Sequence, residues 1–407
     1  MSLSALFSSY TQSTRLLRLT TPLGAHTLLA ESVHGEEGLG SGFRFTITAL
    51  SLDAHLSLRD LIGQPALLEL LTSDNSCRPF HGHLTMVEQS GANAGLARYT
   101  LTLEPWTAFL ARNRDSRVFQ YKTVREILDA VFNGWRAQGK LTPSWRYDLL
   151  DAYPQRSLST QYQESDWAFA ERLMSEVGLF YWFEHTRERH RLVIADHNGA
   201  FKPNRQPTVR FTQSGAVMRE DSIDRWRCTA RLLTNAVQLT SWDYRTHSSR
   251  EVGASLYPAT PEMICRDAPG QYAYPDQEQG QRAAERQLDA IGTRRTTFTG
   301  AGTVRLCAPG TTFTLDGHPG MTTPSSSRGW CMPCATTSMP RSRRGSPNAS
   351  GRSMRRPFTA TASRRLPPRC ATGPVVCCSR DRRYAASKRQ SWSARRTRWC
   401  TPTATTA

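Results

Sequence analysis

Features that would indicate several common functional classes are missing from this sequence of 407 residues. No apolar run approaches the roughly 20 residues that a membrane-spanning helix needs, and the polar start, Ser2 to Tyr10, does not resemble a signal peptide. There is no glycine-rich phosphate loop, no nucleophile elbow and no convincing set of serine, histidine and aspartate. We therefore expect a protein that is not an enzyme and that has neither a membrane span nor a secretory signal.

Acidic residues are almost absent from the last part of the chain. Residues 321–407 hold 18 of the 52 lysines and arginines but only one of the 34 acidic residues, Asp381. The net charge of +18 therefore lies almost entirely in this segment. Leu, Ile, Val and Phe together number only four there, too few for apolar burial to offset chain entropy. We expect residues 321–407 to be a low-complexity, basic and disordered tail.

Metal-binding patterns are also lacking. Cys331 and Cys334, with the Cys377–Cys378 pair, match no common zinc-site spacing. His81 and His83 place two imidazoles on one face of a strand, but no third ligand is evident and strand histidines are common. We predict no metal and no cofactor.

The spacing of apolar residues predicts a mainly β protein with α insertions. Residues 43–49 and 99–103 alternate apolar with polar side chains, a period of two that is typical of half-buried strands. A capping-box sequence at Thr123 predicts one helix, and Ser165-Asp166 predicts a second that ends at Gly178. Further strands are expected at 179–183, 192–195, 237–244 and 296–315, with a third helix at 278–291.

Two runs of residues carry a family resemblance. The first follows Glu104-Pro105-Trp106 and includes Arg114, Asp115, Ser116 and Arg117. The second includes Tyr153, Pro154, Arg156, Gln161, Tyr162, Glu164, Ser165, Asp166, Arg172, Leu173, Met174 and Gly178. With shorter matches at 80–82 and 190–196, the order of these residues resembles the VgrG (Rhs element Vgr) proteins, the spike tips of bacterial type VI secretion systems.

The resemblance implies a fold and a function that periodicity does not show. VgrG front halves resemble the baseplate hub of contractile phage tails, in which three copies form a ring of tandem β-barrels. The resemblance divides the chain into a first barrel domain at 1–110, a helical insertion with a second, incomplete barrel at 111–320, and the tail at 321–407. It implies a structural homotrimer that caps a hexameric Hcp tube and carries secreted effectors or adaptors. The hub would assemble in the cytoplasm, leave through the machine, and meet the target membrane only mechanically.

The tail also resembles a gene of this family read in a shifted frame after about Gly320. Starting each codon of residues 321–334 one base earlier permits D-D-D-A-F-V-V-T-R-V-V-H-A-V, and residues 397–403 permit D-E-V-V-H-T-D. Both products are similar to family stretches in the right order. We therefore hypothesise a frameshift, real or a sequencing error, and expect the chain as written to lack the needle that would follow the hub.

Other interpretations stay open at this point. Arg114, Asp115 and Arg117 could form buried ion pairs at a subunit seam or a solvated loop. Glu164 and Asp166 could act as acid and base, but acids at a helix start are the simpler explanation. The aromatic run 180–183 is better explained by core on one face and interface on the other than by a binding platform. Rival functions are a contractile-phage hub, nucleic-acid binding by the tail, which would not be sequence-specific, and an enzyme in the β-rich front.

Overall fold

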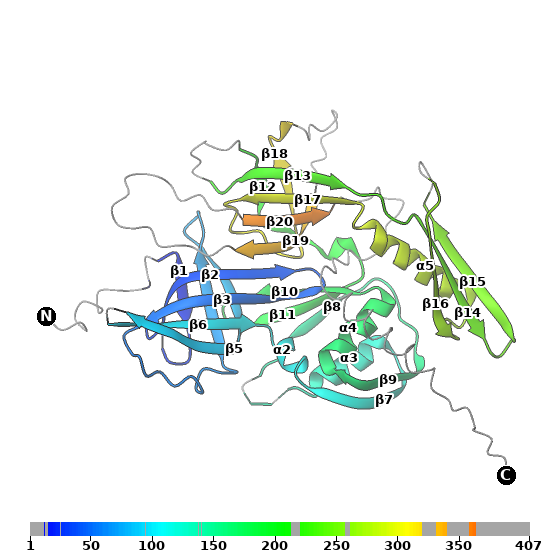
Figure 1. Ribbon diagram of the computed structural model, residues 1–407, viewed down its shortest axis with the longest axis horizontal. Helices are drawn as coiled ribbons and strands as arrows, with labels where there is room; N and C mark the ends of the chain where they lie inside the picture. Colours follow the sequence, from blue (N-terminus) through cyan, green and yellow to red (C-terminus); the bar gives the residue numbers. More distant parts are fainter. Residues whose placement is uncertain are drawn as a thin grey trace, which may run out of the picture.

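The computed structural model describes residue 12, residues 15–24, 26–93, 95–136, 138–139, 141–212, 220–256 and 261–319, and the backbone of two later strands at 331–339 and 358–363. This part of the chain is mainly β with a few helices, which confirms the expected fold class (Figure 1). No helix in these ranges is both long and apolar enough to cross a membrane.

The first β region is an antiparallel sheet in the strand order β1-β4-β5-β6-β3-β2. Its strands are β1 (Leu17–Thr20), β2 (Leu29–Gly38), β3 (Ser41–Ser51), β4 (Pro65–Leu71), β5 (Cys77–Asn93) and β6 (Leu96–Glu104). The alternation predicted for β3 is confirmed, because Phe43, Phe45, Ile47 and Ala49 are each no more than 3% exposed while the residues between them lie on the other face.

The sheet continues beyond β2 into strands from the later part of the chain. The order runs from β2 through β19 (Cys331–Met339), β20 (Phe358–Ser363) and β17 (Thr296–Gly302) to β13 (Ile223–Ala230). β12 (Lys202–Arg210) pairs in parallel with β18 (Thr311–Asp316), which also pairs with β19.

Strands β19 and β20 fall within the range 321–407, where we expected disorder. For these two segments the expectation is wrong, because their backbones pair with β2, β17 and β18. A strand edge offers main-chain donors and acceptors to any extended segment, so an apolar-poor sequence can still pair there. The other residues from 321 onward lie outside the described part of the chain.

A helical and β insertion separates these regions. Its elements are α2 (Thr107–Leu110), β7 (Arg114–Lys122), α3 (Val124–Asn133), β8 (Trp145–Asp148), β9 (Arg156–Ser165), α4 (Asp166–Val177), β10 (Phe180–His185) and β11 (His190–Ala195), followed by the short 3-10 helix η1 (Asn198–Ala200). β7 and β9 form a two-stranded antiparallel sheet. β10, β11 and β8 form a separate sheet of three strands.

Local sequence sets the ends of the two main helices of the insertion. The Thr123 hydroxyl accepts from the Glu126 amide at 3.2 Å, and the Glu126 carboxylate accepts from the Thr123 amide at 2.7 Å, so the predicted capping box is confirmed. The Ser165 hydroxyl caps α4 by accepting from the Ala168 amide at 3.1 Å. Gly178 ends α4 with φ of 81°, a left-handed conformation that glycine adopts without strain.

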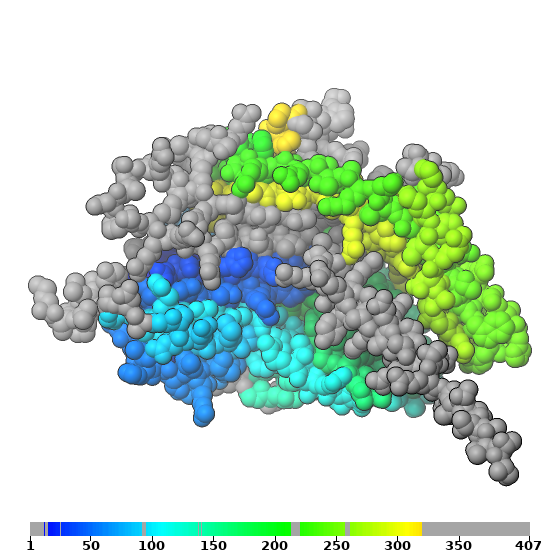
Figure 2. All heavy atoms as spheres, in the orientation of Figure 1, coloured from blue at the N-terminus to red at the C-terminus, as the bar shows by residue number. Residues whose placement is uncertain are grey.

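A third lobe holds β14 (Ala236–Asp243), β15 (Ser248–Ser255), β16 (Ile264–Gln271) and α5 (Gln277–Gly292). Ala284 and Leu288 of the helix pack against Val237, Leu239 and Val252 of the sheet. Figure 2 shows this lobe projecting at one end of the molecule. The predicted helix at 278–291 is confirmed here.

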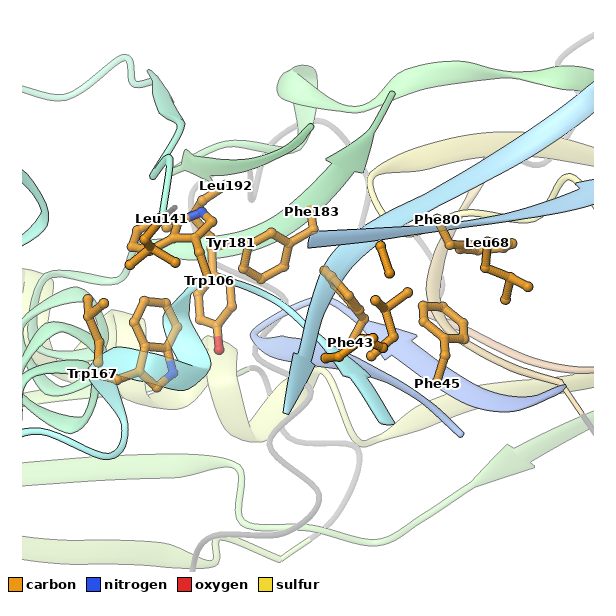
Figure 3. Close-up of a cluster of buried hydrophobic side chains, with 14 of the residues drawn as sticks. Phe43, Phe45, Leu68, Phe80, Trp106, Leu141, Trp167, Tyr181, Phe183 and Leu192 are labelled. Atoms are coloured by element: carbon orange, nitrogen blue, oxygen red, sulfur yellow. The ribbon is translucent and has the colours of Figure 1, made fainter. Parts of the chain in front are cut away.

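The largest hydrophobic core joins the first sheet to the insertion. It includes Phe43, Phe45 and Phe80 from the sheet, and Trp167 and Tyr181 from the insertion (Figure 3). A single cluster of buried side chains therefore includes residues from both sides of position 110. The insertion is held against the first sheet by apolar burial, the dominant favourable contribution to folding.

Candidate functional site: the β7–β9 sheet and its supports

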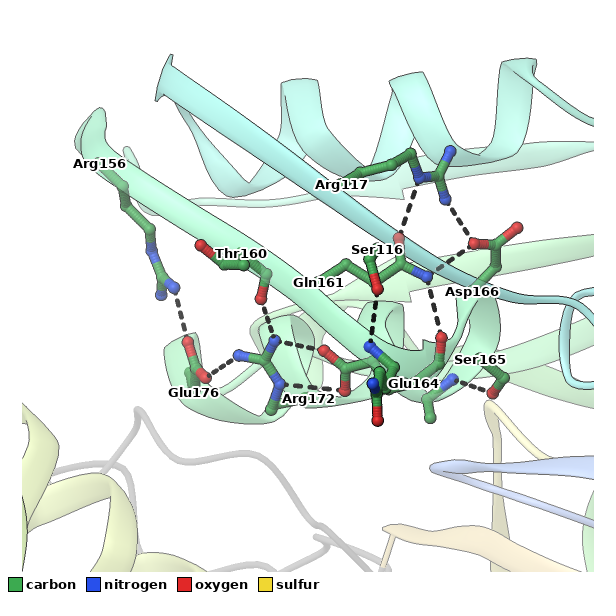
Figure 4. Close-up of polar contacts among 12 residues, drawn as sticks. Ser116, Arg117, Arg156, Thr160, Gln161, Glu164, Ser165, Asp166, Arg172 and Glu176 are labelled. Carbon is green, nitrogen blue, oxygen red and sulfur yellow. Dashed lines mark hydrogen bonds and ion pairs between the residues drawn. The ribbon is translucent and has the colours of Figure 1, made fainter.

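The two runs of residues that carry the family resemblance meet in the β7–β9 sheet. The register places Arg117 opposite Gln161 and Asp115 opposite Glu164. Because side chains alternate along a strand, Arg117 and Phe119 face the helices, while Val118 and Gln120 face away. Residues about 45 positions apart thus form one site (Figure 4).

Asp166, the first residue of α4, organises the inner face. Its side chain is 2% exposed and accepts hydrogen bonds from Gln161 Nε2 at 2.8 Å, Asn113 Nδ2 at 2.9 Å and Trp135 Nε1 at 2.9 Å. The guanidinium of Arg117 completes the set as an ion pair (Figure 4). A buried carboxylate needs such donors, because an unpaired charge in a low-dielectric interior is costly. All of these partners are donors with a structural task, so the helix-start interpretation fits better than acid–base chemistry.

The other charged residues of the first run lie on a strand rather than in a loop. Arg114 donates through Nε to the Gln163 carbonyl at 2.6 Å, and Asp115 pairs with Arg117 at 3.2 Å. The Ser116 hydroxyl accepts from the Gln163 amide at 3.1 Å. The alternative of a solvated loop is therefore wrong, since cross-strand pairing holds the segment extended.

A second charge cluster fixes β9 to α4. Arg172 pairs with Glu164 at 2.6 Å and with Glu176 at 3.0 Å, and donates to the Thr160 carbonyl at 2.9 Å. Arg156 reaches the same Glu176 at 2.6 Å. The hydrogen bond to Glu164 is the main cause that raises the pKa of Arg172, so this guanidinium stays charged.

The remaining residues of the second run are structural. Leu173 and Met174 are buried on α4. The Tyr153 hydroxyl donates to Asp196 at 3.0 Å, and its burial raises its pKa. Pro154 is exposed in the segment before β9. The raised pKa keeps the Tyr153 hydroxyl protonated, so it acts as a hydrogen-bond donor that holds the segment before β9 to Asp196.

The outer face of the β7–β9 sheet has no covering element among the described residues. Val118, Leu158 and Tyr162 are 59%, 57% and 70% exposed there, and Tyr121 at the end of β7 is 73% exposed. Exposed apolar side chains gathered on one face are typical of a surface that binds another molecule. This surface offers contact area rather than reactive groups.

The aromatic run 180–183 is not a surface. Tyr181 and Phe183 pack in the main core, whereas Phe180 and Trp182 pack with Leu39 in a separate cluster. Both faces of β10 are therefore buried within the chain, and the expectation that one face would form an interface is wrong. The predicted burial of one face of this run is confirmed. The second face is covered by a distant segment of the same chain, which includes Leu39.

Sequence reasoning found two histidines of a group of four. His81 and His83 on β5 lie beside His185 and His190, which are opposite each other in the β10–β11 register. Burial lowers the pKa of His81 to about 4 and that of His185 to about 3, and also lowers the pKa values of His83 and His190. The sequence signal that could have revealed the other two histidines was the β-hairpin pattern, which places His185 opposite His190.

No cluster of three or more potential metal ligands with suitable geometry occurs among the described residues. The side chains of Cys331 and Cys334, and the Cys377–Cys378 pair, lie outside what the structure describes. A shallow hollow of about 330 Å³ over β14 and β15 contains Glu251 and Glu262 as its ionisable groups. Two carboxylates without a facing base or nucleophile do not make a catalytic site.

Comparisons with known proteins agree with one another. A family model described as phage tail baseplate hub (GPD) matches residues 36–331. The type VI secretion system spike protein VgrG1b of Pseudomonas aeruginosa is 31% identical over 313 residues, which are 76% of this chain and 41% of that protein. The chain thus spans less than half the length of this relative.

Solved structures show the same fold at lower identity. A tail protein from Neisseria meningitidis MC58 aligns with a TM-score of 0.61 and 13% identity, covering 86% of this chain and 96% of that one. The E. coli c3393 protein, described as a component of the type VI secretion system with structural similarity to the T4 tail proteins gp27 and gp5, aligns with a TM-score of 0.57 and 19% identity, covering 86% and 77%.

Proposed function

Because this chain belongs to the phage tail baseplate hub (GPD) family, we propose that three copies of it form the hub of a type VI puncturing device and cap a hexameric Hcp tube. The observation that carries the proposal is the similarity to type VI spike proteins along three quarters of the chain. The family is structural rather than enzymatic, and the described site holds ion pairs and apolar contacts instead of reactive groups.

The mechanism that follows is mechanical. Three chains would transmit force from the tube to whatever follows the hub, so the requirement is rigidity. The Asp166 and Arg172 clusters provide it locally, because they fix β7 and β9 to α4 by hydrogen bonds to charged groups, the strongest kind in proteins. Secreted effectors or adaptors would be further partners, the route of export would be the machine itself, and the target membrane would be met only by force.

The decisive experiment is light scattering on the full chain after size-exclusion chromatography, followed by co-purification with Hcp. We expect a mass three times the 45.7 kDa of one chain and retention of Hcp. A mass of one chain at all concentrations, together with no retained Hcp, would overturn the proposal. Two exposed leucines offer a matched pair of variants: Leu158→Asp on the outer face of the β7–β9 sheet and Leu232→Asp away from it. Loss of assembly in only the first would locate the contact.

A contractile-phage hub is the alternative, and the family model, described as a phage tail baseplate hub, favours it. Neighbouring genes separate the two functions. Sheath and Hcp genes beside this one would support the secretion device, whereas capsid and tail-fibre genes would support a phage particle.

We also propose that residues beyond about Gly320 are encoded in a shifted frame. The abrupt change in charge and apolar content after residue 320 supports this, as does the end of the family match at residue 331. Sequencing the gene from native DNA and translating the neighbouring frame tests it. We expect an open frame that continues the family sequence, and an early stop codon in that frame would refute the proposal.

A further inference from the structure

The four histidines lie at the joint between the first sheet and the β10–β11 hairpin. His83 and His190 are 1% and 3% exposed, His81 is 8% exposed, and the side chain of His185 is 6% exposed. The rings contact one another at centroid distances of 5.3 to 6.4 Å. Four imidazoles buried together are far more than a structural joint requires.

The hydrogen bonds at this joint specify where each proton lies. The Trp106 amide can only donate, and it points at His190 Nε2 at 2.8 Å. That nitrogen is therefore an unprotonated acceptor, and the single proton of neutral His190 is on Nδ1. His190 Nδ1 lies 3.0 Å from His81 Nδ1, so it donates and the His81 nitrogen accepts. The chain of bonds runs from Trp106 through His190 to His81 in one direction.

This chain of bonds tolerates no additional proton. A second proton on His190 would place an N–H against the Trp106 amide, and a second proton on His81 would place an N–H against His190 Nδ1. In each case two donors face each other and one hydrogen bond is lost. His185 is limited by burial instead: its Nδ1–H donates to the His81 carbonyl at 3.2 Å, and a second proton on Nε2 would add a buried charge at an atom that has no hydrogen-bond partner among the described residues.

The charged groups around the joint offer no free counter-charge. Glu37 of β2 lies 3.8 Å from His185 Nε2, but it is paired with Arg78 of β5. Glu104 of β6 is next to His83 in the ladder and is paired with Arg44 and Arg112. The other acids are Glu69 of β4, paired with Arg187, and the exposed Glu188 in the β10–β11 turn. The remaining neighbours are aromatic rings: the ring centroids of Phe43 and His185 are 4.6 Å apart, and those of Phe109 and His83 are 5.3 Å apart.

We infer that this four-histidine joint is an acid-sensitive latch, which holds the β10–β11 hairpin on the first sheet while all four imidazoles are neutral and opens locally when one of them takes up a proton. The inference concerns the folded chain itself and does not depend on the hub function. The lowered pKa values of the histidines agree with this inference, because they mean that the open form binds protons more readily than the closed form. The latch is therefore stable above about pH 6.5, the ordinary histidine pKa. It weakens as the pH falls toward 4, the pKa of His81 in the closed form.

Hydrogen exchange of the full chain, read by mass spectrometry and corrected for intrinsic rates, tests the latch. The Trp106 amide reports it directly, and the Leu71 amide of β4, bonded to the Leu16 carbonyl at 2.9 Å, reports the first sheet. Between pH 6.5 and 4.5 we expect protection at Trp106 to fall about tenfold for each pH unit and each proton taken up, while protection at Leu71 holds. Equal loss at both amides, or no loss at Trp106, would overturn the inference.

A pair of variants sharpens the test. In His81→Asn the amide oxygen can still accept from His190 Nδ1 but cannot be protonated. The dependence of Trp106 amide protection on pH should therefore correspond to one proton fewer. The control His55→Asn removes an exposed histidine and should leave the slope unchanged. Equal slopes in the two variants would contradict the latch. If His81→Asn does not fold, the pH series on the unaltered chain decides the question alone.

Discussion

The carboxylate of Asp166 and the guanidinium of Arg117 form an ion pair between the start of α4 and the middle of β7. The side chain of Asp166 is 2% exposed and that of Arg117 32%, so the pair lies at the edge of the interior. The two residues are 49 positions apart, and their contact unites the two runs that carry the family resemblance. The family pattern therefore marks a structural joint rather than a reactive centre.

Removing the Asp166 carboxylate should substantially lower the free energy of unfolding. Asp166→Ala would leave Gln161, Asn113, Trp135 and the guanidinium of Arg117 without their acceptor. We expect a loss of about 3 kcal/mol in the free energy of unfolding, the lower end for a broken buried pair because Arg117 is partly solvated. Urea denaturation measures it. Asp115→Ala is the control, since Asp115 is 44% exposed and should cost less than about 1 kcal/mol. Equal losses in the two variants would contradict this account of Asp166.

Alanine substitutions at two glycines distinguish the free-energy cost of backbone strain from that of a steric clash. Gly310 and Gly40 have φ of 74° and 64°, so a Cβ is disfavoured at both. A Cβ at Gly310 would lie 2.2 Å from Trp182 Nε1, whereas a Cβ at Gly40 would meet nothing within 4 Å. We expect Gly40→Ala to cost about 1 kcal/mol and Gly310→Ala a further 1 to 3 kcal/mol, roughly the cost of overpacking. Equal melting temperatures for the two variants would show that the indole moves aside without cost.

Local patterns in the sequence predicted much of this fold. The alternation of β3, the capping box at Thr123 and the left-handed stop at Gly178 depend on neighbours within a few residues. Each was therefore visible without the structure. Burial of one face of the aromatic run 180–183 was predicted from its composition, whereas burial of the other face depends on a distant segment that includes Leu39.

The rest depends on contacts between distant segments. β7 has few apolar residues, and it is extended because β9, some 40 positions later, pairs with it. The histidine joint was half visible, since His81 and His83 are neighbours but their approach to His190 needs the β10–β11 hairpin to pack on β5. Strands β19 and β20 were missed because main-chain pairing at a sheet edge leaves little trace in composition.

Arg78 of β5 pairs with Glu37 of β2 within the first sheet, and its further hydrogen bonds join that sheet to the later β region. Both side chains are less than 10% exposed, and Arg78 also donates to the carbonyls of Arg305 at 2.9 Å and Cys307 at 2.6 Å. Arg78→Met should leave Glu37 buried without its partner and cost about 3 to 5 kcal/mol. The double variant with Glu37→Met should recover part of this, because an apolar pair has no unmatched charge. Guanidinium denaturation of the unaltered chain, Arg78→Met, Glu37→Met and the double variant measures the coupling between the two side chains. Additive losses would show that Arg78 contributes through its carbonyl contacts rather than through Glu37.

Asp289 on α5 should reduce stability at neutral pH. Burial, and secondarily the negative charge of Glu285 one turn earlier, raise its pKa to about 6. The folded chain therefore holds this proton more tightly than the unfolded chain does, so the stability from this group is complete below about pH 4 and is lost as pH rises through 6. Asp289→Asn should raise the free energy of unfolding at pH 7 by up to about 1 kcal/mol, an allowance for partial solvation.

The difference between Asp289→Asn and the unaltered chain isolates this group, because the histidine contributions of opposite sign cancel in the subtraction. It should be largest at pH 7 and shrink toward zero at pH 4, where the carboxyl is protonated and resembles the amide. Glu278→Gln, in the exposed first turn of the same helix, is the control and should not stabilise the chain at pH 7, because the carboxylate it removes is exposed and paired with Arg282. A stabilisation by Asp289→Asn that stays constant from pH 7 to pH 4 would assign the effect to packing, because a burial penalty on a charge must disappear with the charge.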